Sequence, residues 1–147
     1  MSGQVWVSDR RGEGAAPPVD PERVRAAAAA VLAAEGRADA NLSVTLTSDA
    51  EIATLHAEYL GVPGPTDVIS FPLEDDVGPE TVLGEVVVSV DTAAREAAER
   101  GTSLERELLL YVIHGSLHLL GYDDQSEPER ARMHARQEAL LAAFLGE

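Results

Sequence analysis

The segment LLLYVIHGSLHLLGYDD, residues 108–124, constrains the fold more than any other part of the chain. Apolar side chains dominate it as far as Leu120, yet it stays short of the roughly 18 consecutive apolar residues of a membrane-spanning helix. A capping box of Thr102 and Glu105 precedes the segment and Gly121 interrupts it, so the pattern predicts a helix that ends at the glycine. A helix this apolar has to be buried in a folded domain.

The period of the apolar residues and the turn formers between them predict the other elements. Strands are expected at residues 5–9, 41–47, 67–72 and 84–90, with an acidic loop before the last of them. Further helices are expected to begin after Asp20, Ser48, Asp91 and Ser126. This order implies one α+β domain over residues 1–147, in which a small mixed four-stranded sheet packs against about five helices.

Some of these expectations concern single side chains. Strand 41–47 alternates apolar with polar residues, which is the pattern of a half-buried strand. Tyr59 is expected on the apolar face of its helix, and Asp91 is expected to cap the helix that follows it. Trp6 and Phe71 are expected in the core rather than in a base-stacking platform, because the chain has no basic groove interleaved with aromatic residues.

Composition narrows the chemistry. The chain has no cysteine, so disulfides and thiolate ligands are excluded, any metal must be held by His, Asp or Glu, and the cytoplasm is the natural compartment. Asp and Glu number 26 against 11 Lys and Arg, which gives a formal net charge of −15. A surface this acidic is solubilising and repels polyanions, so a nucleic-acid role must overcome it.

Two histidines stand four residues apart in the apolar helix, and residues at this spacing lie on one face. His114 and His118 can therefore point at one ion. Gly121 permits a left-handed residue that turns the chain back and brings Asp123 or Asp124 over the helix end as a third ligand. Two imidazoles and one carboxylate suit Zn²⁺, with nickel, cobalt or manganese as alternatives.

Other readings of the two histidines stay open. They could be core residues that are hydrogen-bonded to backbone or to carboxylates. A metalloprotease would carry its general-base Glu directly after the first histidine, where this chain has Gly115, so we rank that class lower. Gly115 and Ser116 are small and are expected to leave the approach to the ion open. A glycine inside a helix costs about 0.5 to 1 kcal/mol relative to alanine, so its presence asks for a reason.

The motif HGSLHLLGYDD resembles the signature of the YbeY family of bacterial rRNA-maturation factors, H-G-x-L-H-L-x-G-Y-D-H. The segment PTDVISFPLE, residues 65–74, is similar to that family's P-T-D-V-L-S-F-P stretch. LGEVVVSVDTAAREA, residues 83–97, resembles its L-G-D-I-x-I-S segment and the helix that follows, and TSDAEIATLHAEYLG, residues 47–61, resembles its second helix. The resemblance runs in order from about residue 41 to the C-terminus.

This resemblance implies a metal-dependent, single-strand-specific endoribonuclease that matures rRNA, including the 3′ end of 16S rRNA, and serves ribosome quality control. The implied metal ligands are His114, His118 and Asp124. Glu85 takes the position of the L-G-D acid and would orient water or face the site, or else be a solvated acid at a strand edge. Thr66 and Ser70 would contact substrate, or else serve turn chemistry. The implied partners are single-stranded rRNA, the small ribosomal subunit and assembly factors such as the Era GTPase, in the cytoplasm and without a membrane.

The chain departs from the family pattern in two places. The third family ligand is usually histidine, and Asp124 at that position makes a more anionic and harder site. The family's Arg and Lys after the second-helix tyrosine are missing around Leu60 and Val62. The nearest basic candidates in sequence to compensate are Arg95, Arg100 and Arg106. Two other functions therefore remain: a non-catalytic, metal-stabilised binding factor for ribosome assembly, and a metal-dependent hydrolase of another substrate.

Overall fold

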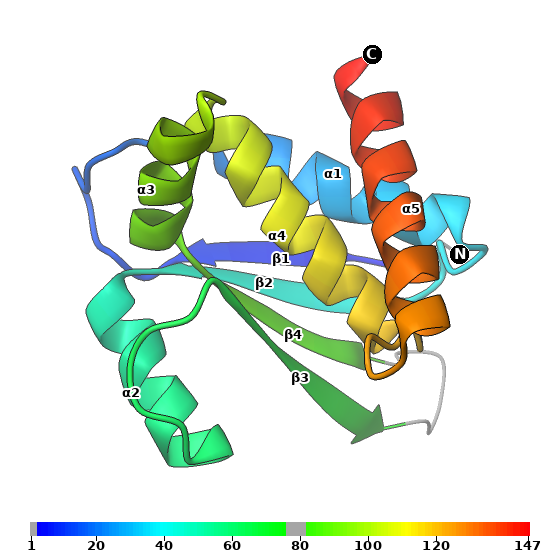
Figure 1. Cartoon of the computed structure of the whole chain (residues 1–147), viewed down its shortest axis with the longest axis horizontal. Helices are drawn as coiled ribbons and strands as arrows, with labels where there is room; N and C mark the ends of the chain where they lie inside the picture. Colours follow the sequence, from blue (N-terminus) through cyan, green and yellow to red (C-terminus); the bar gives the residue numbers. More distant parts are fainter. Residues whose placement is uncertain (1–2, 76–81) are drawn as a thin grey trace.

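The computed structural model describes residues 3–75 and 82–147 (Figure 1). Its strands are β1 (Val5–Asp9), β2 (Asn41–Thr47), β3 (Val68–Asp75) and β4 (Val82–Ser89). Its helices are α1 (Pro21–Ala34), α2 (Asp49–Leu60), α3 (Val90–Arg100), α4 (Leu104–Leu119) and α5 (Glu127–Leu145). The predicted α+β class and element order are confirmed, whereas the predicted acidic loop between β3 and β4 falls mainly on residues outside the described ranges.

The four strands form one mixed, open sheet in the order β1-β2-β4-β3. β1 and β2 are parallel, β2 and β4 are parallel, and β3 runs antiparallel to β4. A parallel connection needs a crossover, so α1 connects β1 to β2, and α2 followed by β3 connects β2 to β4. The antiparallel strands β3 and β4 are consecutive in sequence. β1 and β3 are the outer strands of this sheet.

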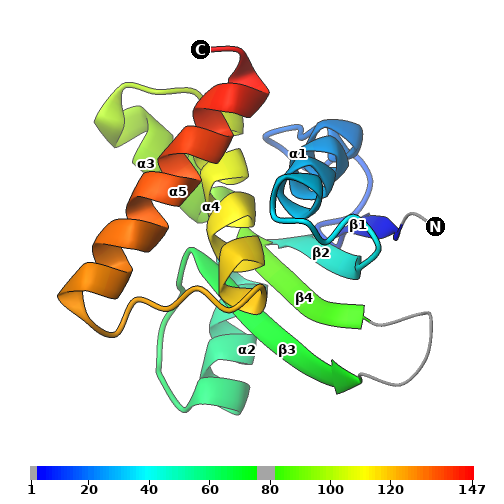
Figure 2. The same ribbon diagram turned by 90° about the vertical axis from the view of Figure 1, so that its right-hand side faces the viewer.

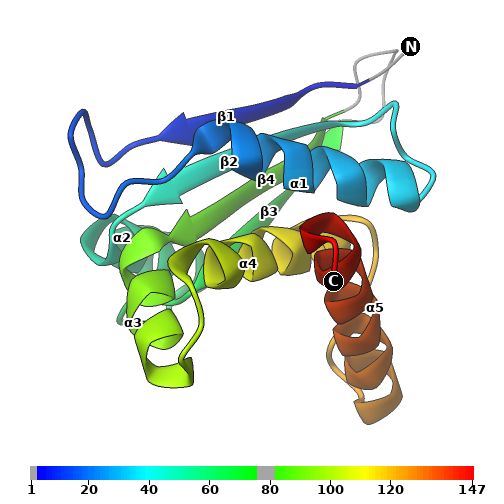
Figure 3. The same ribbon diagram turned by 90° about the horizontal axis from the view of Figure 1, so that it is seen from above.

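Helices cover both faces of the sheet unequally (Figure 2). α1 and α4 pack on one face, whereas α2 lies on the other. Successive residues of β4 point to opposite faces, so Val86 and Val88 join the main core under α4. Val87 joins a smaller cluster with Ile69 of β3 and Ile52 of α2. α3 and α5 pack against α4 toward its two ends and complete the layer (Figure 3).

α4 is the buried helix that the sequence predicts. Its side chains Leu109, Val112, Ile113 and Leu117 are fully buried, and burying one such side chain stabilises the fold by about 1.5–3 kcal/mol. The N-cap is Ser103, whose hydroxyl accepts from the Arg106 amide, so the expected capping box at Thr102 is wrong by one residue. Within the described residues no helix has the length and apolar character needed to cross a membrane.

Gly115 has a packing role that the sequence interpretation missed. A Cβ atom at this position would lie 2.6 Å from Val86 Cγ1 and 3.1 Å from Ser70 Oγ, so only glycine lets α4 approach the sheet this closely. Ser116 is also buried, and its hydroxyl donates to the Val112 carbonyl at 2.7 Å. The small size of Gly115 is thus explained by helix–sheet packing, and an open approach to an ion beside these two residues stays a prediction.

The helix that Asp91 is predicted to cap has another N-cap, and Asp91 bonds a different helix. The N-cap of α3 is Ser89, whose hydroxyl accepts from the Thr92 amide at 3.1 Å. Asp91 instead accepts from the Asp49 amide at 2.9 Å, which is the first residue of α2. Asp91 therefore joins the beginnings of two helices that are distant in sequence.

Burial differs from the expectation at β2 and at two aromatic residues. β2 is buried on both faces rather than half-buried, because Thr45 and Thr47 on its second face are also buried and donate to Glu85 Oε2 and to the Val88 carbonyl of the neighbouring β4. Trp6 and Tyr59 are 47% and 65% exposed, so neither is the core residue that the sequence predicts. Phe71 is half-buried and meets the Tyr59 ring edge to face, with 5.4 Å between ring centroids.

Candidate metal centre

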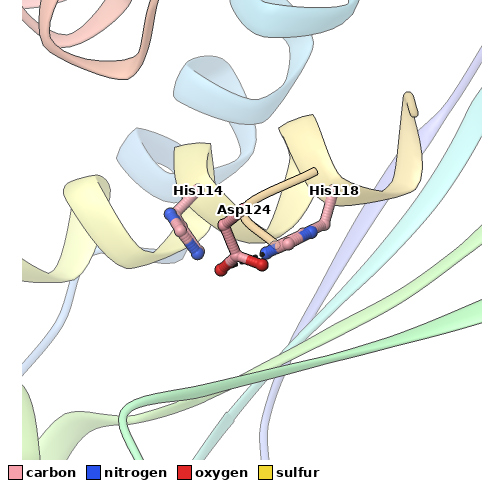
Figure 4. A group of neighbouring side chains, drawn as sticks. All are labelled: His114, His118 and Asp124. Carbon is pink, nitrogen blue, oxygen red and sulfur yellow. Dashed lines mark ion pairs between the residues drawn. The ribbon is translucent and has the colours of Figure 1, made fainter. Parts of the chain in front are cut away.

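The last turn and a half of α4 and the loop after it bring three possible ligands together (Figure 4). His114 and His118 project from α4, and Asp124 reaches toward them from the loop. One donor atom of each residue lies within 4.8 Å of the other two, and His118 Nε2 is 3.5 Å from Asp124 Oδ2. All three side chains are half-buried. Two imidazoles and a carboxylate converging in this way could hold a metal ion.

The loop conformation selects Asp124 rather than its neighbour. Gly121 adopts φ +104°, a conformation that L side chains rarely take, and turns the chain at the end of α4. Asp123 Oδ1 accepts from the amides of Asp124 and Gln125 at 2.7 and 3.2 Å. These bonds form an Asx turn, in which Asp123 shapes the loop while Asp124 faces the histidines.

Gln137 of α5 is a contact of the site that sequence reasoning missed. Its Oε1 lies 2.8 Å from His114 Nδ1, and the side chain is only 9% exposed. Histidines that bind metals usually donate their other ring N–H to an acceptor of this kind. The sequence held a signal for it, because Gln137 interrupts a stripe of buried apolar residues, four positions after Met133 and four before Leu141.

A second network ties the loop to the rest of the molecule. The Tyr122 hydroxyl donates to Glu35 Oε1 at 2.7 Å, and Arg136 Nε donates to Glu35 Oε2 at 2.6 Å. The hydrogen bond to Glu35, together with burial, raises the pKa of the Tyr122 phenol above its usual value. Glu35 caps the C-terminus of α1, so one carboxylate joins α1, the Asp124 loop and α5.

Ser70 and Thr66, the two residues expected to contact substrate, make different contacts in the structure. Ser70 of β3 donates its hydroxyl to the Gly115 carbonyl at 3.1 Å, which places it against the residue after His114. Thr66 precedes β3, and its hydroxyl contacts Asp67 Oδ1 at 3.3 Å. The structure therefore brings Ser70 to the histidine helix, while Thr66 lines a separate pocket of about 300 Å³ together with Arg95 of α3 and Tyr111 of α4.

Glu85 lies on the opposite face of the sheet from α4. It follows the alternation of β4, in which Val86 faces α4 and Glu85 faces α2. Its Oε2 accepts from Thr45 Oγ1 at 2.6 Å. It lines a pocket of about 320 Å³ together with Tyr59 and Phe71. The structure thus does not bring Glu85 together with His114, His118 and Asp124.

The predicted basic candidates are all engaged by carboxylates. Arg95 pairs with Asp49, and Arg106 pairs with Glu147. Arg100 pairs with Glu96 and with the buried Glu107. Leu60 and Val62, where the family pattern has cations, are exposed apolar residues. A guanidinium that the sequence analysis did not single out stands next to the site instead.

That guanidinium belongs to Arg130 of α5. Its Nη1 donates to the Asp124 carbonyl at 2.9 Å, and its Nη2 pairs with Glu127. The side chain is half-exposed, so part of the cation faces solvent beside the candidate ligand. This hydrogen bond therefore places the Arg130 guanidinium directly beside Asp124.

Comparison with known sequences gives a consistent result. Residues 16–145 match the family model described as Endoribonuclease YbeY. The chain is 49% identical over 124 residues to "Endoribonuclease YbeY" of Anaeromyxobacter sp. (strain Fw109-5), a match that covers 84% of this chain and 64% of that protein. It is 41% identical over 143 residues to the protein of the same name from Pelotomaculum thermopropionicum, which covers 93% of this chain and 94% of the relative. The chain thus spans less than two thirds of the first of these relatives.

Comparison with solved structures supports the fold. The solution structure of TM1509 from Thermotoga maritima superposes with a TM-score of 0.69 at 28% sequence identity. The match covers 97% of this chain and 90% of the other. The similarity therefore extends from β1 and α1, where the sequence motifs gave no signal, to the end of α5.

Proposed function

The chain belongs to the YbeY family, and from this premise we propose that it is a metal-dependent endoribonuclease that hydrolyses phosphodiester bonds in single-stranded rRNA. The observation that carries the proposal is the convergence of His114, His118 and Asp124 within 4.8 Å. The names of the curated relatives supply the activity, and the site supplies donor groups that suit it.

The three ligands fit a transition metal in their chemistry. We propose zinc, one ion per chain, because two imidazoles and a carboxylate are a frequent donor set for catalytic zinc. Nickel, cobalt and manganese are compatible alternatives, since the carboxylate makes the site harder than three imidazoles would. When bound, such an ion would supply Lewis-acid polarisation of a phosphodiester oxygen. The buried helix α4 fixes the positions of His114 and His118, and the turn that Asp123 makes fixes the position of Asp124.

Other side chains receive roles according to where they lie. Ser70 is proposed to line the substrate path beside α4, which its bond to the Gly115 carbonyl supports. Arg130 is proposed to meet a phosphate in exchange for its ion pair with Glu127, because its hydrogen bond to the Asp124 carbonyl places it beside the candidate ligands. Thr66 is proposed to contact RNA at the start of β3. Glu85, on the far face of the sheet, is proposed to act outside the reacting site.

The biological setting is also a proposal. We expect residues 1–147 to act as one hydrolase domain in the cytoplasm, on 16S rRNA 3′ ends and in ribosome quality control. The net charge of −15 and the paired arginines argue against strong binding to free RNA. Action on rRNA within the small subunit, with assembly factors such as the Era GTPase, would let basic partner proteins supply the missing positive charge.

The test is cleavage of single-stranded RNA by three preparations: metal-free protein, protein reconstituted with zinc, and His118→Ala. We expect cleavage only from the reconstituted parent. Equal cleavage by all three would indicate a contaminating nuclease and would overturn the proposal.

A second candidate function is a non-catalytic assembly factor that the metal only stabilises. The ion pairs of Arg95, Arg100 and Arg106 favour it, because these cations are not free to neutralise phosphates. Binding of the reconstituted protein to small ribosomal subunits without any RNA turnover would support this function over the nuclease.

A further inference from the structure

We propose that Gln137 is a positioning residue of the metal centre. Its carboxamide oxygen holds His114 in the tautomer that carries the proton on Nδ1, which leaves Nε2 as the metal-binding nitrogen. This inference rests on the metal site of the proposed function. It adds a residue of α5 to a centre whose ligands come from α4 and the loop.

The hydrogen-bond geometry sets the tautomer. Gln137 Oε1 is 2.8 Å from His114 Nδ1. A carboxamide oxygen can only accept a hydrogen bond, so Nδ1 must be the donor in this contact. A neutral imidazole with the proton on Nδ1 presents its lone pair on Nε2. The protein therefore selects the metal-binding form of His114 before an ion arrives.

The surroundings of Gln137 make this bond difficult to replace. Met133 and Leu141, one turn to either side, are fully buried, and Gln137 itself is 9% exposed. A buried polar group left without a hydrogen-bond partner destabilises the folded protein. Breaking the bond between the Gln137 carboxamide and His114 is therefore unfavourable, and through this bond α5 holds the His114 ring in one orientation.

The neutral character of Gln137 also limits the charge of the site. Asp124 already contributes one carboxylate to the centre. A carboxylate at position 137 would accept the same hydrogen bond and make His114 a more basic ligand, because outer acceptors raise ligand basicity. The structure thus predicts opposite effects for the two near-isosteric replacements, Gln137→Leu and Gln137→Glu.

The experiment measures the tautomer and the metal affinity separately. In the metal-free protein, ¹⁵N NMR of the His114 ring is expected to show Nδ1 protonated in the parent and in Gln137→Glu, and a mixture of tautomers in Gln137→Leu. Zinc affinity, from competition with a chromophoric chelator, is expected to fall about 10–100-fold in Gln137→Leu, as for other outer-shell contacts. Gln137→Glu is expected to bind zinc at least as tightly as the parent.

Leu141→Ala is the matched control. It removes a buried side chain from the same helix one turn away, so it should lower stability and leave the tautomer and the zinc affinity unchanged. The inference is overturned if Gln137→Leu keeps the parent's tautomer and affinity, if Leu141→Ala weakens zinc as much, or if the parent binds no zinc. Zinc binding that depends on Gln137 without RNA cleavage would leave this inference intact and overturn the nuclease.

Discussion

The two faces of the sheet are built differently. The face under α1 and α4 holds a core drawn from most elements of the fold, including Leu109, Val112, Ile113 and Leu117 of α4 itself. The face under α2 holds a small cluster of Ile52, Ile69 and Val87, against which only Leu55 and Phe71 pack among the described residues. Two of the three candidate ligands, His114 and His118, project from α4, the helix that belongs to the larger core, and Asp124 comes from the loop that follows it.

This difference separates the groups that need fixed geometry from those that do not. Ligands on a helix whose neighbours are locked by packing keep their positions better than ligands on a loosely covered surface. Glu85 and its neighbour Val86 show that adjacent residues of one strand serve opposite faces of the sheet. Val86 points at α4, while Glu85 points at α2, because side chains alternate along a strand. One position in the sequence therefore decides which face a residue serves.

The largest effect is expected from opening cavities on the two faces. Leu109→Ala and Ile52→Ala each remove a fully buried side chain, and such changes cost about 2–5 kcal/mol. We expect Leu109→Ala to fall toward the upper end, since the large core around α4 cannot collapse into the space, and Ile52→Ala toward the lower end. Urea unfolding of both variants measures the difference. A greater loss from Ile52→Ala would show that the α2 face carries the stability.

Metal binding should distinguish the two faces next. Zinc at about 100 times its dissociation constant should stabilise the metal-free parent by about 2.7 kcal/mol, through binding to the folded state alone. Asp124→Ala should lose most of this gain. Glu85→Gln, which changes an acid on the α2 face, should keep it. Thermal unfolding with and without zinc gives the result, and an equal loss in both variants would contradict the placement of Glu85 outside the site.

Gly115→Ala tests the close contact between α4 and the sheet. The added methyl group would meet Val86 Cγ1, and overpacking of this kind costs about 1–3 kcal/mol. Ser116→Ala, one residue later, removes only a hydroxyl bonded within the helix and should cost less. Urea unfolding compares them. A more stable Gly115→Ala would mean that helix propensity outweighs packing, and that α4 can move off the sheet at little cost.

Local patterns allowed much of this fold to be predicted. The apolar run predicted the burial of α4, and Ser48 and Ser126 correctly predicted the starts of α2 and α5, whose N-caps they form. The spacing of His114 and His118 and the glycine after them predicted a pair of ligands with an acid close by. These features depend on residues a few positions apart, which is the range over which sequence periodicity is informative.

The rest depends on contacts between distant parts of the chain. Asp91 bonds the start of α2 rather than its own helix, and Glu35 meets Tyr122 and Arg136 across most of the sequence. No local pattern encodes which helix a carboxylate will reach once the helices pack. Gln137 is intermediate, because its place in an apolar stripe marked it as unusual while its partner His114 could be identified only in three dimensions.

The smallest effect is expected from the network that anchors the Asp124 loop. Tyr122→Phe removes the bond to Glu35 and should cost about 0.5–1.5 kcal/mol at neutral pH. Because that bond raises the pKa of Tyr122 in the folded state, its contribution is complete below the unfolded value of about 10 and is lost as pH rises above it. Burial raises the pKa of Tyr111 as well, so the parent and the variant share that alkaline loss, and only their difference reports Tyr122. Urea unfolding at neutral and alkaline pH should show that the stability difference between the parent and Tyr122→Phe shrinks as pH rises.

Tyr59→Phe, at an exposed position, is the control and should match the parent at neutral pH. A difference for Tyr122→Phe that stays constant through the alkaline range would show that the ring's packing, and not its bond to Glu35, anchors the loop.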